Sequence, residues 1–256
     1  MAMETPGVPD HFSPVAASYA AHRPAYPAAL VDYLADHAPG HDLAWDAGCG
    51  SGQLSVGLAR RFARVIATDR SAAQLARAAA HSHVEYRLAS AEACGIAEGM
   101  VDLAVAAQAV HWFDLPAYYA EVRRVSRRGA LVALVTYGLL RIDPKVDPII
   151  DRLYAETLGP YWPPERRHVE AGYGSLAFPF TELPAPALEM RADWSLDQVL
   201  GFIDTWSAVR GLEREQGRAL LGEFGRDLAR IWGPSAARRR VRWDLVLRVG
   251  RVGVAG

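Results

Sequence analysis

Cysteine is scarce in this chain of 256 residues, which contains only Cys49 and Cys94. Two cysteines cannot build a disulfide framework, and their spacing does not match the paired ligands of a structural metal site. The sequence therefore argues against a disulfide-stabilised scaffold and predicts no metal centre. Cys49 is expected to act as a small side chain that packs easily.

An excess of charge of one sign is missing as well. Lysine and arginine number 28 and aspartate and glutamate 29, so the formal net charge is −1. We therefore expect neither nucleic acid nor a membrane as a partner. The longest apolar run, from Ala130 to Leu140, is too short to cross a bilayer and predicts a buried strand. No secretory leader is recognisable at the N-terminus, and these features together predict a soluble, cytoplasmic protein.

A glycine-rich turn follows the first predicted strand. Glycine occupies every second position from Gly48 to Gly52, between an apolar run that begins at Leu43 and a helical run that begins at Gln53. Glycine permits a sharp turn and a close approach of the backbone to a ligand. The helix that follows offers free N–H groups and a positive dipole end. This layout predicts a nucleotide-binding turn.

The spacing of the glycines separates two kinds of nucleotide site. The dinucleotide fingerprint places its third glycine where this chain has Gln53. Asp46, just before the turn, is unfavourable beside a diphosphate but suits a ligand that carries an ammonium and a sulfonium. The turn therefore favours S-adenosylmethionine, and the predicted binding residues are Asp46, Gly48, Cys49 and Gly50.

A second carboxylate follows the next predicted strand. The run from Val65 to Thr68 is apolar and β-rich, and Asp69 lies at its carboxyl end, where open α/β sheets bind ligands. A carboxylate there can accept hydrogen bonds from both hydroxyls of a ribose, with Arg70 beside it. Asp69 could instead cap the helix that begins near Ser71. Its position one βαβ unit after the glycine turn favours ribose binding.

Strands and helices alternate after Leu43, which predicts an α/β fold with a parallel, doubly wound sheet. The expected strands are 43–46, 65–68, 84–88, 101–106 and 130–136, and the expected helices are 53–62, 71–80 and 115–127. Residues 139–186 break this rhythm with eight prolines and many aromatic residues, which predicts an inserted cap over the active site. A strand at 187–194, helices within 195–231 and a last strand at 242–249 complete a single domain of residues 1–256, with an N-terminal helical cover over 1–40.

The pattern Asp46-x-Gly48-x-Gly50-x-Gly52, followed by Asp69, resembles the class I S-adenosylmethionine-dependent methyltransferases. Three further stretches resemble the methyltransferase type 11 branch that includes trans-aconitate and cantharidin methyltransferases. They are Tyr-Ala-Ala-His-Arg-Pro-Ala-Tyr-Pro at 19–27, Ala-Gln-Ala-Val-His-Trp-Phe at 107–113, and Tyr161-Trp162 with Gly172-Tyr173. The resemblance implies a Rossmann-like, seven-stranded sheet whose last strand runs antiparallel.

The resemblance also implies further cofactor contacts. The N-terminal segment would fold over the cofactor, with Tyr19 beside it and the Arg23 guanidinium paired with its carboxylate. Without the resemblance, Tyr19 could simply pack between helices and Arg23 could be solvated. Gln108 would meet the methionine portion of the cofactor.

Adenine recognition departs from the family pattern. Many relatives carry an acid after the third strand, which holds the adenine amino group, and this chain has Ser90 there. Recognition of adenine would then depend on backbone groups near Ala91 or on Glu92. Asp102 opens the fourth strand and is expected to have a structural role at its base.

The acceptor side is expected at the end of the fourth strand. His111 has two interpretations: a general base whose ordinary pKa near 6.5 suits neutral pH, or a wall residue that shapes the pocket. Trp112 would form part of the same wall. The acceptor pocket would be completed by Tyr137 and by Trp162 and Tyr173 of the cap. These cap aromatics could alternatively form only the cap's own small core.

The predicted reaction is the in-line transfer of a methyl group from a sulfonium to an oxygen of a small molecule, a carboxylate or a hydroxyl. Three arginines of the cap would suit an acidic acceptor; they are Arg141, Arg166 and Arg167. Two alternatives stay open, a nicotinamide-dependent oxidoreductase and a non-catalytic S-adenosylmethionine-binding protein. Asp46 and Gln53 weigh against the oxidoreductase. We expect a monomer or a weak dimer.

Overall fold

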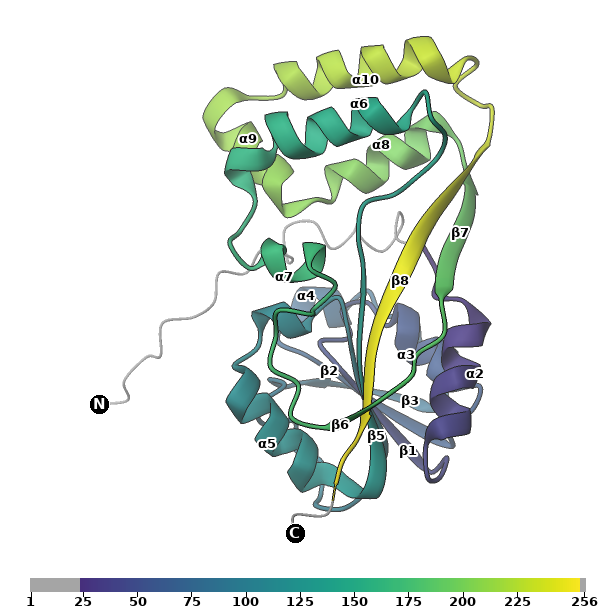
Figure 1. Cartoon of the computed structure of the whole chain (residues 1–256), viewed down its shortest axis with the longest axis vertical. Coiled ribbons are helices and arrows are strands. Elements are labelled where there is room, and N and C mark those ends of the chain that lie inside the picture. Colours follow the sequence, from purple (N-terminus) through teal and green to yellow (C-terminus); the bar gives the residue numbers. More distant parts are fainter. Residues whose placement is uncertain (1–23, 254–256) are drawn as a thin grey trace, which may run out of the picture.

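A mixed β-sheet runs through residues 24–253, which the computed structural model describes (Figure 1). Its parallel half has the strand order β3-β2-β1-β4-β5. These strands are β1 (Leu43–Ala47), β2 (Arg64–Asp69), β3 (Val84–Leu88), β4 (Val101–Ala107) and β5 (Ser126–Tyr137). The strand order reverses between β1 and β4, so a ligand site is expected outside the carboxyl ends of these two strands.

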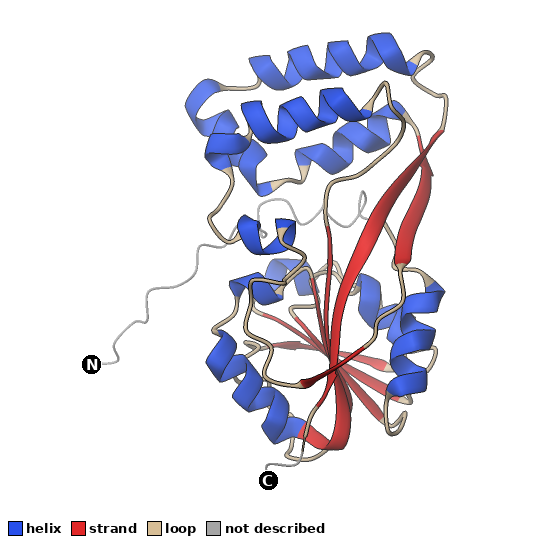
Figure 2. Ribbon diagram, viewed as in Figure 1, coloured by secondary structure: helices blue, strands red, loops and turns tan. Residues whose placement is uncertain are grey.

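Helices cover both faces of the parallel half, as Figure 2 shows. One face packs against α2 (Ala28–His37) and α3 (Gln53–Leu58), and the other packs against α5 (Leu115–Val125). Because successive residues of a strand point to opposite faces, Leu103 joins the first core and Ala104 the second. Burial on both faces explains why these strands are continuous apolar runs in the sequence.

The antiparallel edge of the sheet consists of β8 (Arg239–Arg251), β6 (Thr181–Leu183) and β7 (Leu188–Trp194). Leu245 of β8 pairs with Tyr137 of β5 and with Leu188 of β7, so β6 and β7 share the edge of β8 that faces away from β5. Pro184 and Pro186 lie between β6 and β7, and proline has no N–H to donate to a neighbouring strand. The two strands are therefore one interrupted edge strand. The sheet has seven positions and an antiparallel last strand, which confirms the predicted fold class.

Asp102 fixes the base of the parallel half. Its Oδ2 accepts hydrogen bonds from the N–H groups of Asp42 and Leu43 at 2.9 and 3.0 Å. Its Oδ1 lies 3.0 Å from the Arg127 guanidinium. The buried carboxylate therefore ties the start of β4 to the start of β1, which is the structural role that its position in the sequence indicated.

A helical lobe lies beyond the carboxyl ends of the parallel strands, at the top of Figure 1. Its helices are α6 (Asp147–Arg152), α8 (Leu196–Asp204), α9 (Ser207–Gln216) and α10 (Ala219–Trp232), with the short turns η3 (Leu153–Thr157) and η4 (Gly159–Tyr161). The ring of Trp243 anchors the lobe to β8, because it lies 4.9 Å from the ring of Trp194 and 5.4 Å from that of Phe202. The lobe is thus built from two stretches of chain, one within 139–186 and one after it.

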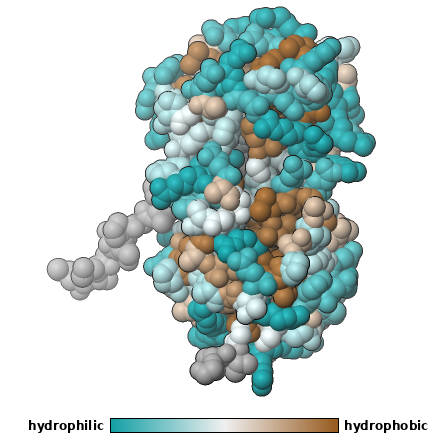
Figure 3. Space-filling view, viewed as in Figure 1, coloured by the Kyte–Doolittle hydropathy of each residue, from teal (hydrophilic) through white to brown (hydrophobic). Residues whose placement is uncertain are grey.

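The segment between these two stretches returns to the sheet. It contains α7 (Arg166–Glu170) and β6. Figure 3 shows a waist between the lobe and the sheet, with hydrophobic surface beside it on the face in view. The space between the two parts of the molecule is where an acceptor is expected to bind.

Two predicted helices are wrong in length. The structure places α3 at Gln53–Leu58 instead of 53–62, and α4 at Ala72–Leu75 instead of 71–80. Residues 76–80 carry alanine and arginine only, so a longer α4 would bury no large apolar side chain. A short helix gains most of its stability from such packing.

Candidate active site

The glycine turn connects β1 to α3 with left-handed backbone at Gly48, Gly50 and Gly52. A Cβ at Gly48 would lie 2.5 Å from the Cβ of Ala109, and one at Gly52 would lie 2.3 Å from the hydroxyl of Tyr86. A Cβ at Gly50 would meet nothing within 4 Å. Packing within the chain therefore requires glycine at the first and third positions, whereas Gly50 faces open space.

Asp69 is held in place by two backbone groups at the end of β2. Its Oδ2 accepts a hydrogen bond from the N–H of Gly50 and its Oδ1 from the N–H of Ser71, both at 2.8 Å. The N-cap of α4 is Ser71, whose hydroxyl accepts from the N–H of Gln74. The alternative interpretation of Asp69 as the helix cap is therefore wrong. A carboxylate oxygen can accept more than one hydrogen bond, so Asp69 can also receive ligand hydroxyls.

Asp46 is a buried carboxylate at the end of β1, with 1% of its surface exposed. Its Oδ2 accepts a hydrogen bond from the Ser55 hydroxyl at 2.6 Å. Burial raises the pKa of Asp46 to about 7, and the negative charge of Asp69 adds to this effect. A cation bound beside Asp46 would oppose both influences and favour its ionised form.

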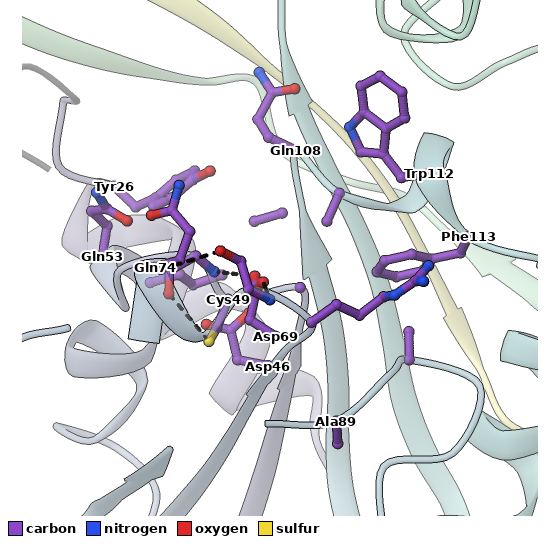
Figure 4. A pocket seen from close by; sticks show the side chains of 18 of the residues that line it. Tyr26, Asp46, Cys49, Gln53, Asp69, Gln74, Ala89, Gln108, Trp112 and Phe113 are labelled. Carbon is purple, nitrogen blue, oxygen red and sulfur yellow. Dashed lines mark hydrogen bonds between the residues drawn. The ribbon is translucent and has the colours of Figure 1, made fainter. Parts of the chain in front are cut away.

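A cavity of about 250 Å³ opens over these residues (Figure 4). It is lined by most of the residues that the sequence singled out for the cofactor, namely Asp46, Gly48, Cys49, Gly50, Asp69, Arg70, Ala91 and Gln108. Trp112 and Tyr137, predicted for the acceptor, also line it. The carboxyl ends of β1, β2 and β4 therefore meet at one cavity, as the strand order requires.

Four other predicted cofactor residues do not line this cavity or cannot be placed. Ser90 forms an isolated bridge with Ala93, and the Glu92 carboxylate accepts a hydrogen bond from the N–H of Asp114 at 3.1 Å. Tyr19 and Arg23 lie outside the described residues.

The cavity also has walls that the sequence did not single out as site residues, including Tyr26, Gln53, Gln74 and Phe113. Tyr26 and Phe113 belong to the stretches 19–27 and 107–113 that carry the family resemblance. Gln74 gave a weaker signal. It is a polar residue in the short helix after Asp69, and the structure leaves only 2% of its surface exposed.

A second, smaller cavity of about 60 Å³ adjoins the first. The two cavities share three wall residues, Gln108, Trp112 and Tyr137. Gln108 has a left-handed backbone (φ 55°), and its side chain donates to the carbonyl of Tyr137 at 2.8 Å and accepts from the Thr136 hydroxyl at 3.1 Å. Both ends of its amide are therefore bonded to β5, which makes Gln108 a fixed partition between the cavities.

His111 lines the second cavity and not the first. Its Nδ1 lies 2.9 Å from the hydroxyl of Tyr173. Burial lowers the pKa of His111 to about 3, and the positive charges of Arg166 and His168 add to this shift. The expected ordinary pKa near 6.5 is therefore wrong. Tyr173 itself is fully buried and lines neither cavity; it lies behind His111 and holds its ring.

The far wall of the second cavity comes from the lobe and from α7. Trp162 and Trp206 both line it, with ring centroids 5.8 Å apart. The Arg166 guanidinium lies 4.9 Å from the centroid of the Trp162 ring, and its Nε donates to the Tyr154 hydroxyl at 2.7 Å. Among residues 24–253, no carboxylate forms an ion pair with Arg166. This cavity therefore combines aromatic walls with a positive charge that is not neutralised by an ion pair.

Comparisons with known proteins identify the family. A model described as a methyltransferase domain matches residues 45–134. A protein of Dictyostelium discoideum that bears the name of a methyltransferase is 32% identical over 227 residues, which cover 87% of this chain and 86% of the relative. The chain belongs to the S-adenosylmethionine-dependent methyltransferases.

Two further relatives extend this result. A solved structure described as a type II methyltransferase, from Anaeromyxobacter dehalogenans, is 49% identical and has a TM-score of 0.85. The match covers 90% of this chain and 98% of that one. A malonyl-[acyl-carrier protein] O-methyltransferase of Dechloromonas aromatica is 37% identical over 112 residues, which are 43% of this chain and 41% of the relative.

The residues of the larger cavity fit S-adenosylmethionine, the cofactor of this methyltransferase. Asp46 offers a buried carboxylate that a cationic ligand would stabilise in its charged form. Gly50 leaves open space beside the turn, and Asp69 presents a fixed carboxylate at the end of the neighbouring strand. Membership of the methyltransferase family excludes the nicotinamide-dependent oxidoreductase, the alternative that the sequence left open. In the methyltransferase, no helix among the described residues has the length and apolar character that a membrane span requires.

Proposed function

We propose that this methyltransferase methylates a carboxylate oxygen of a small molecule that binds in the second cavity. The observation that carries this proposal is the position of Arg166 in that cavity. Gln108 separates Arg166 from the cofactor cavity. A carboxylate in the second cavity could form a two-pronged ion pair with the Arg166 guanidinium. An oxygen acceptor is also consistent with the name of the Dechloromonas relative.

The size and walls of the cavity favour a small, flat acceptor group. About 60 Å³ accommodates roughly four groups of the size of a water molecule, if one such group needs about 15 Å³. Trp112, Tyr137, Trp162 and Trp206 supply aromatic faces around this space. A carboxylate attached to a planar carbon skeleton satisfies both the volume and the aromatic surroundings.

His111 favours a carboxylate over a hydroxyl as the acceptor. An imidazole with a pKa of about 3 is a weak base and would remove a proton from an alcohol only with difficulty. A carboxylic acid is already ionised at neutral pH and needs no base. His111 would then act as a neutral wall of the acceptor cavity, kept in one orientation by Tyr173.

The cofactor supplies the methyl group on a sulfonium, which is an activated donor. The remaining requirements are alignment and exclusion of water. Gln108 would fix the boundary between donor and acceptor through its two hydrogen bonds to β5, and the rings of Trp112 and Tyr137 would exclude water there. In this proposal Tyr19 and Arg23 cover the cofactor, residues 139–186 cap the acceptor, and the protein acts as a monomer or weak dimer.

The proposal predicts a preference among acceptors. Small unsaturated carboxylic acids should accept label from methyl-labelled S-adenosylmethionine, whereas the matched primary alcohols should not. Arg166→Met should raise the acid's KM at least tenfold, since a hydrogen bond to a charged group contributes about 1.5–3 kcal/mol. Arg167→Met is the matched control, because Arg167 is exposed and does not line the cavity.

Label transfer to the alcohols at an equal or higher rate would contradict the carboxylate assignment and restore His111 as a base. An unchanged KM in Arg166→Met would show that the guanidinium does not bind the acceptor. Isothermal titration with the cofactor alone checks that each variant keeps an intact cofactor cavity.

A further inference from the structure

An amide oxygen without a partner is buried in the wall of the cofactor cavity. Gln74 is 2% exposed and lines the cavity of about 250 Å³. Its Oε1 has no hydrogen-bond partner among the residues that the structure describes. Leaving such an acceptor unsatisfied costs about 1–3 kcal/mol. An oxygen of this kind in the wall of a ligand cavity indicates that the ligand supplies the missing donor.

The backbone of Gln74 is tied to Asp69 through a single residue. The N–H of Gln74 donates to the hydroxyl and to the carbonyl of Ser71, at 3.3 and 3.1 Å. The N–H of Ser71 in turn donates to Asp69. The start of α4 is therefore fixed relative to the carboxylate at the end of β2, and Figure 4 shows both side chains at the cavity.

We propose that Gln74 is a further cofactor-binding residue, whose Oε1 accepts a hydrogen bond from a ribose hydroxyl of S-adenosylmethionine. The inference rests on the assignment of the ribose to Asp69. Among the donors of the cofactor, the ammonium is best matched by the buried charge of Asp46 on β1. The ribose hydroxyls and the adenine amino group are both neutral donors and need no charged acceptor, which suits the amide of Gln74. The amino group is expected after β3, whereas Gln74 is linked through Ser71 to Asp69, the expected ribose ligand. Asp69 and Gln74 would together bind the ribose from β2 and α4.

The test uses binding of the demethylated cofactor, S-adenosylhomocysteine, and needs neither an acceptor nor turnover. Its outcome is therefore independent of the proposed carboxylate substrate. Gln74→Met keeps the length of the side chain and removes the hydrogen-bond acceptor. Isothermal titration should show affinity reduced by about five- to tenfold, the size of one hydrogen bond.

Cofactor analogues that lack one ribose hydroxyl show which hydroxyl donates the hydrogen bond to Gln74. Wild-type protein and Gln74→Met are each titrated with the 2′-deoxy and 3′-deoxy forms of S-adenosylhomocysteine. The variant's defect should vanish with the one analogue that lacks the bonded hydroxyl and persist with the other, which is the signature of a coupled pair. Gln74→Met should also be as thermally stable as the wild type without ligand, because it removes an unsatisfied buried group.

Two results would overturn the proposal. One is unchanged affinity for S-adenosylhomocysteine in Gln74→Met. The other is an equal loss with both deoxy analogues, which would show that the substitution acts on the shape of the cavity and not on a ribose hydroxyl. If Gln74→Met does not fold, Gln74→Leu is titrated in the same way, because it also removes the amide oxygen.

Discussion

The carboxylate of Asp46 is buried at the carboxyl end of β1, and burial raises its pKa to about 7. In the unfolded chain this group titrates near 3.8. The folded protein without cofactor therefore retains a proton between about pH 4 and pH 7 that the unfolded chain has lost. The contribution of Asp46 to the free energy of unfolding therefore falls as the pH rises through this window, because the raised pKa favours the folded state only while the carboxyl group is protonated.

Cofactor binding should show the opposite dependence on pH. A cationic ligand binds best to the ionised form of Asp46, so affinity for S-adenosylmethionine should rise about tenfold from pH 6 to pH 8 and then level off. Binding at pH 6 should release a proton, which titrations in buffers of different ionisation enthalpy can measure. Asp46→Asn should bind more weakly and lose this pH dependence. An identical pH profile in Asp46→Asn would assign the titration to another group.

Two glycines of the turn should respond differently to alanine, although both have positive φ. Gly50→Ala adds a Cβ that meets no atom, so the fold should lose only about 1–2 kcal/mol from backbone strain. Its Cβ enters the cofactor cavity, and affinity for S-adenosylmethionine should fall sharply. Gly48→Ala also collides with Ala109 at 2.5 Å, which adds about 1–3 kcal/mol of overpacking. Thermal unfolding and titration separate the two effects, and equal melting temperatures would contradict this distinction.

At the scale of elements, the second cavity depends on how η4, α7 and α9 meet. Trp162, directly after η4, donates from its indole N–H to the carbonyl of Tyr154 at 3.0 Å and also packs on Trp206. The same ring is therefore a wall of the acceptor cavity and a part of the lobe's core. The two interpretations that the sequence left open for the cap aromatics both apply to Trp162.

Truncation of Trp162 should therefore affect the acceptor and stability together. We expect Trp162→Ala to raise the acceptor KM at least tenfold and to lower the melting temperature, with cofactor affinity within about twofold of the wild type. A buried aromatic residue replaced by alanine costs about 3–5 kcal/mol, and less is expected here because Trp162 is only partly buried. Tyr161→Ala is the control: Tyr161 packs in the same lobe but does not line the cavity. An equal rise of KM in both variants would indicate a purely structural role.

At the scale of the whole molecule, the site lies between a sheet and a lobe that are interleaved along the chain. The chain leaves the sheet after β5, builds part of the lobe, returns through α7 to β6, and goes back into the lobe after β7. Both passages between the lobe and the sheet bring side chains to the second cavity. Arg166 lies on the passage from the lobe back to the sheet, and Ser207, at the start of α9, follows the return to the lobe. The aromatic content of 139–186 indicated a cap, but it did not indicate that helices after 195 would complete it.

The sequence by itself determined the parallel sheet, the nucleotide turn and the acid after β2. These features depend on local backbone preferences and on apolar runs that nearly any packing would bury. Only the tertiary structure decided the pKa of His111, the position of Tyr173 behind it and the orphaned oxygen of Gln74. Each of these properties depends on which distant groups remove water from a side chain or leave it without a partner, and residue spacing carries no information on that.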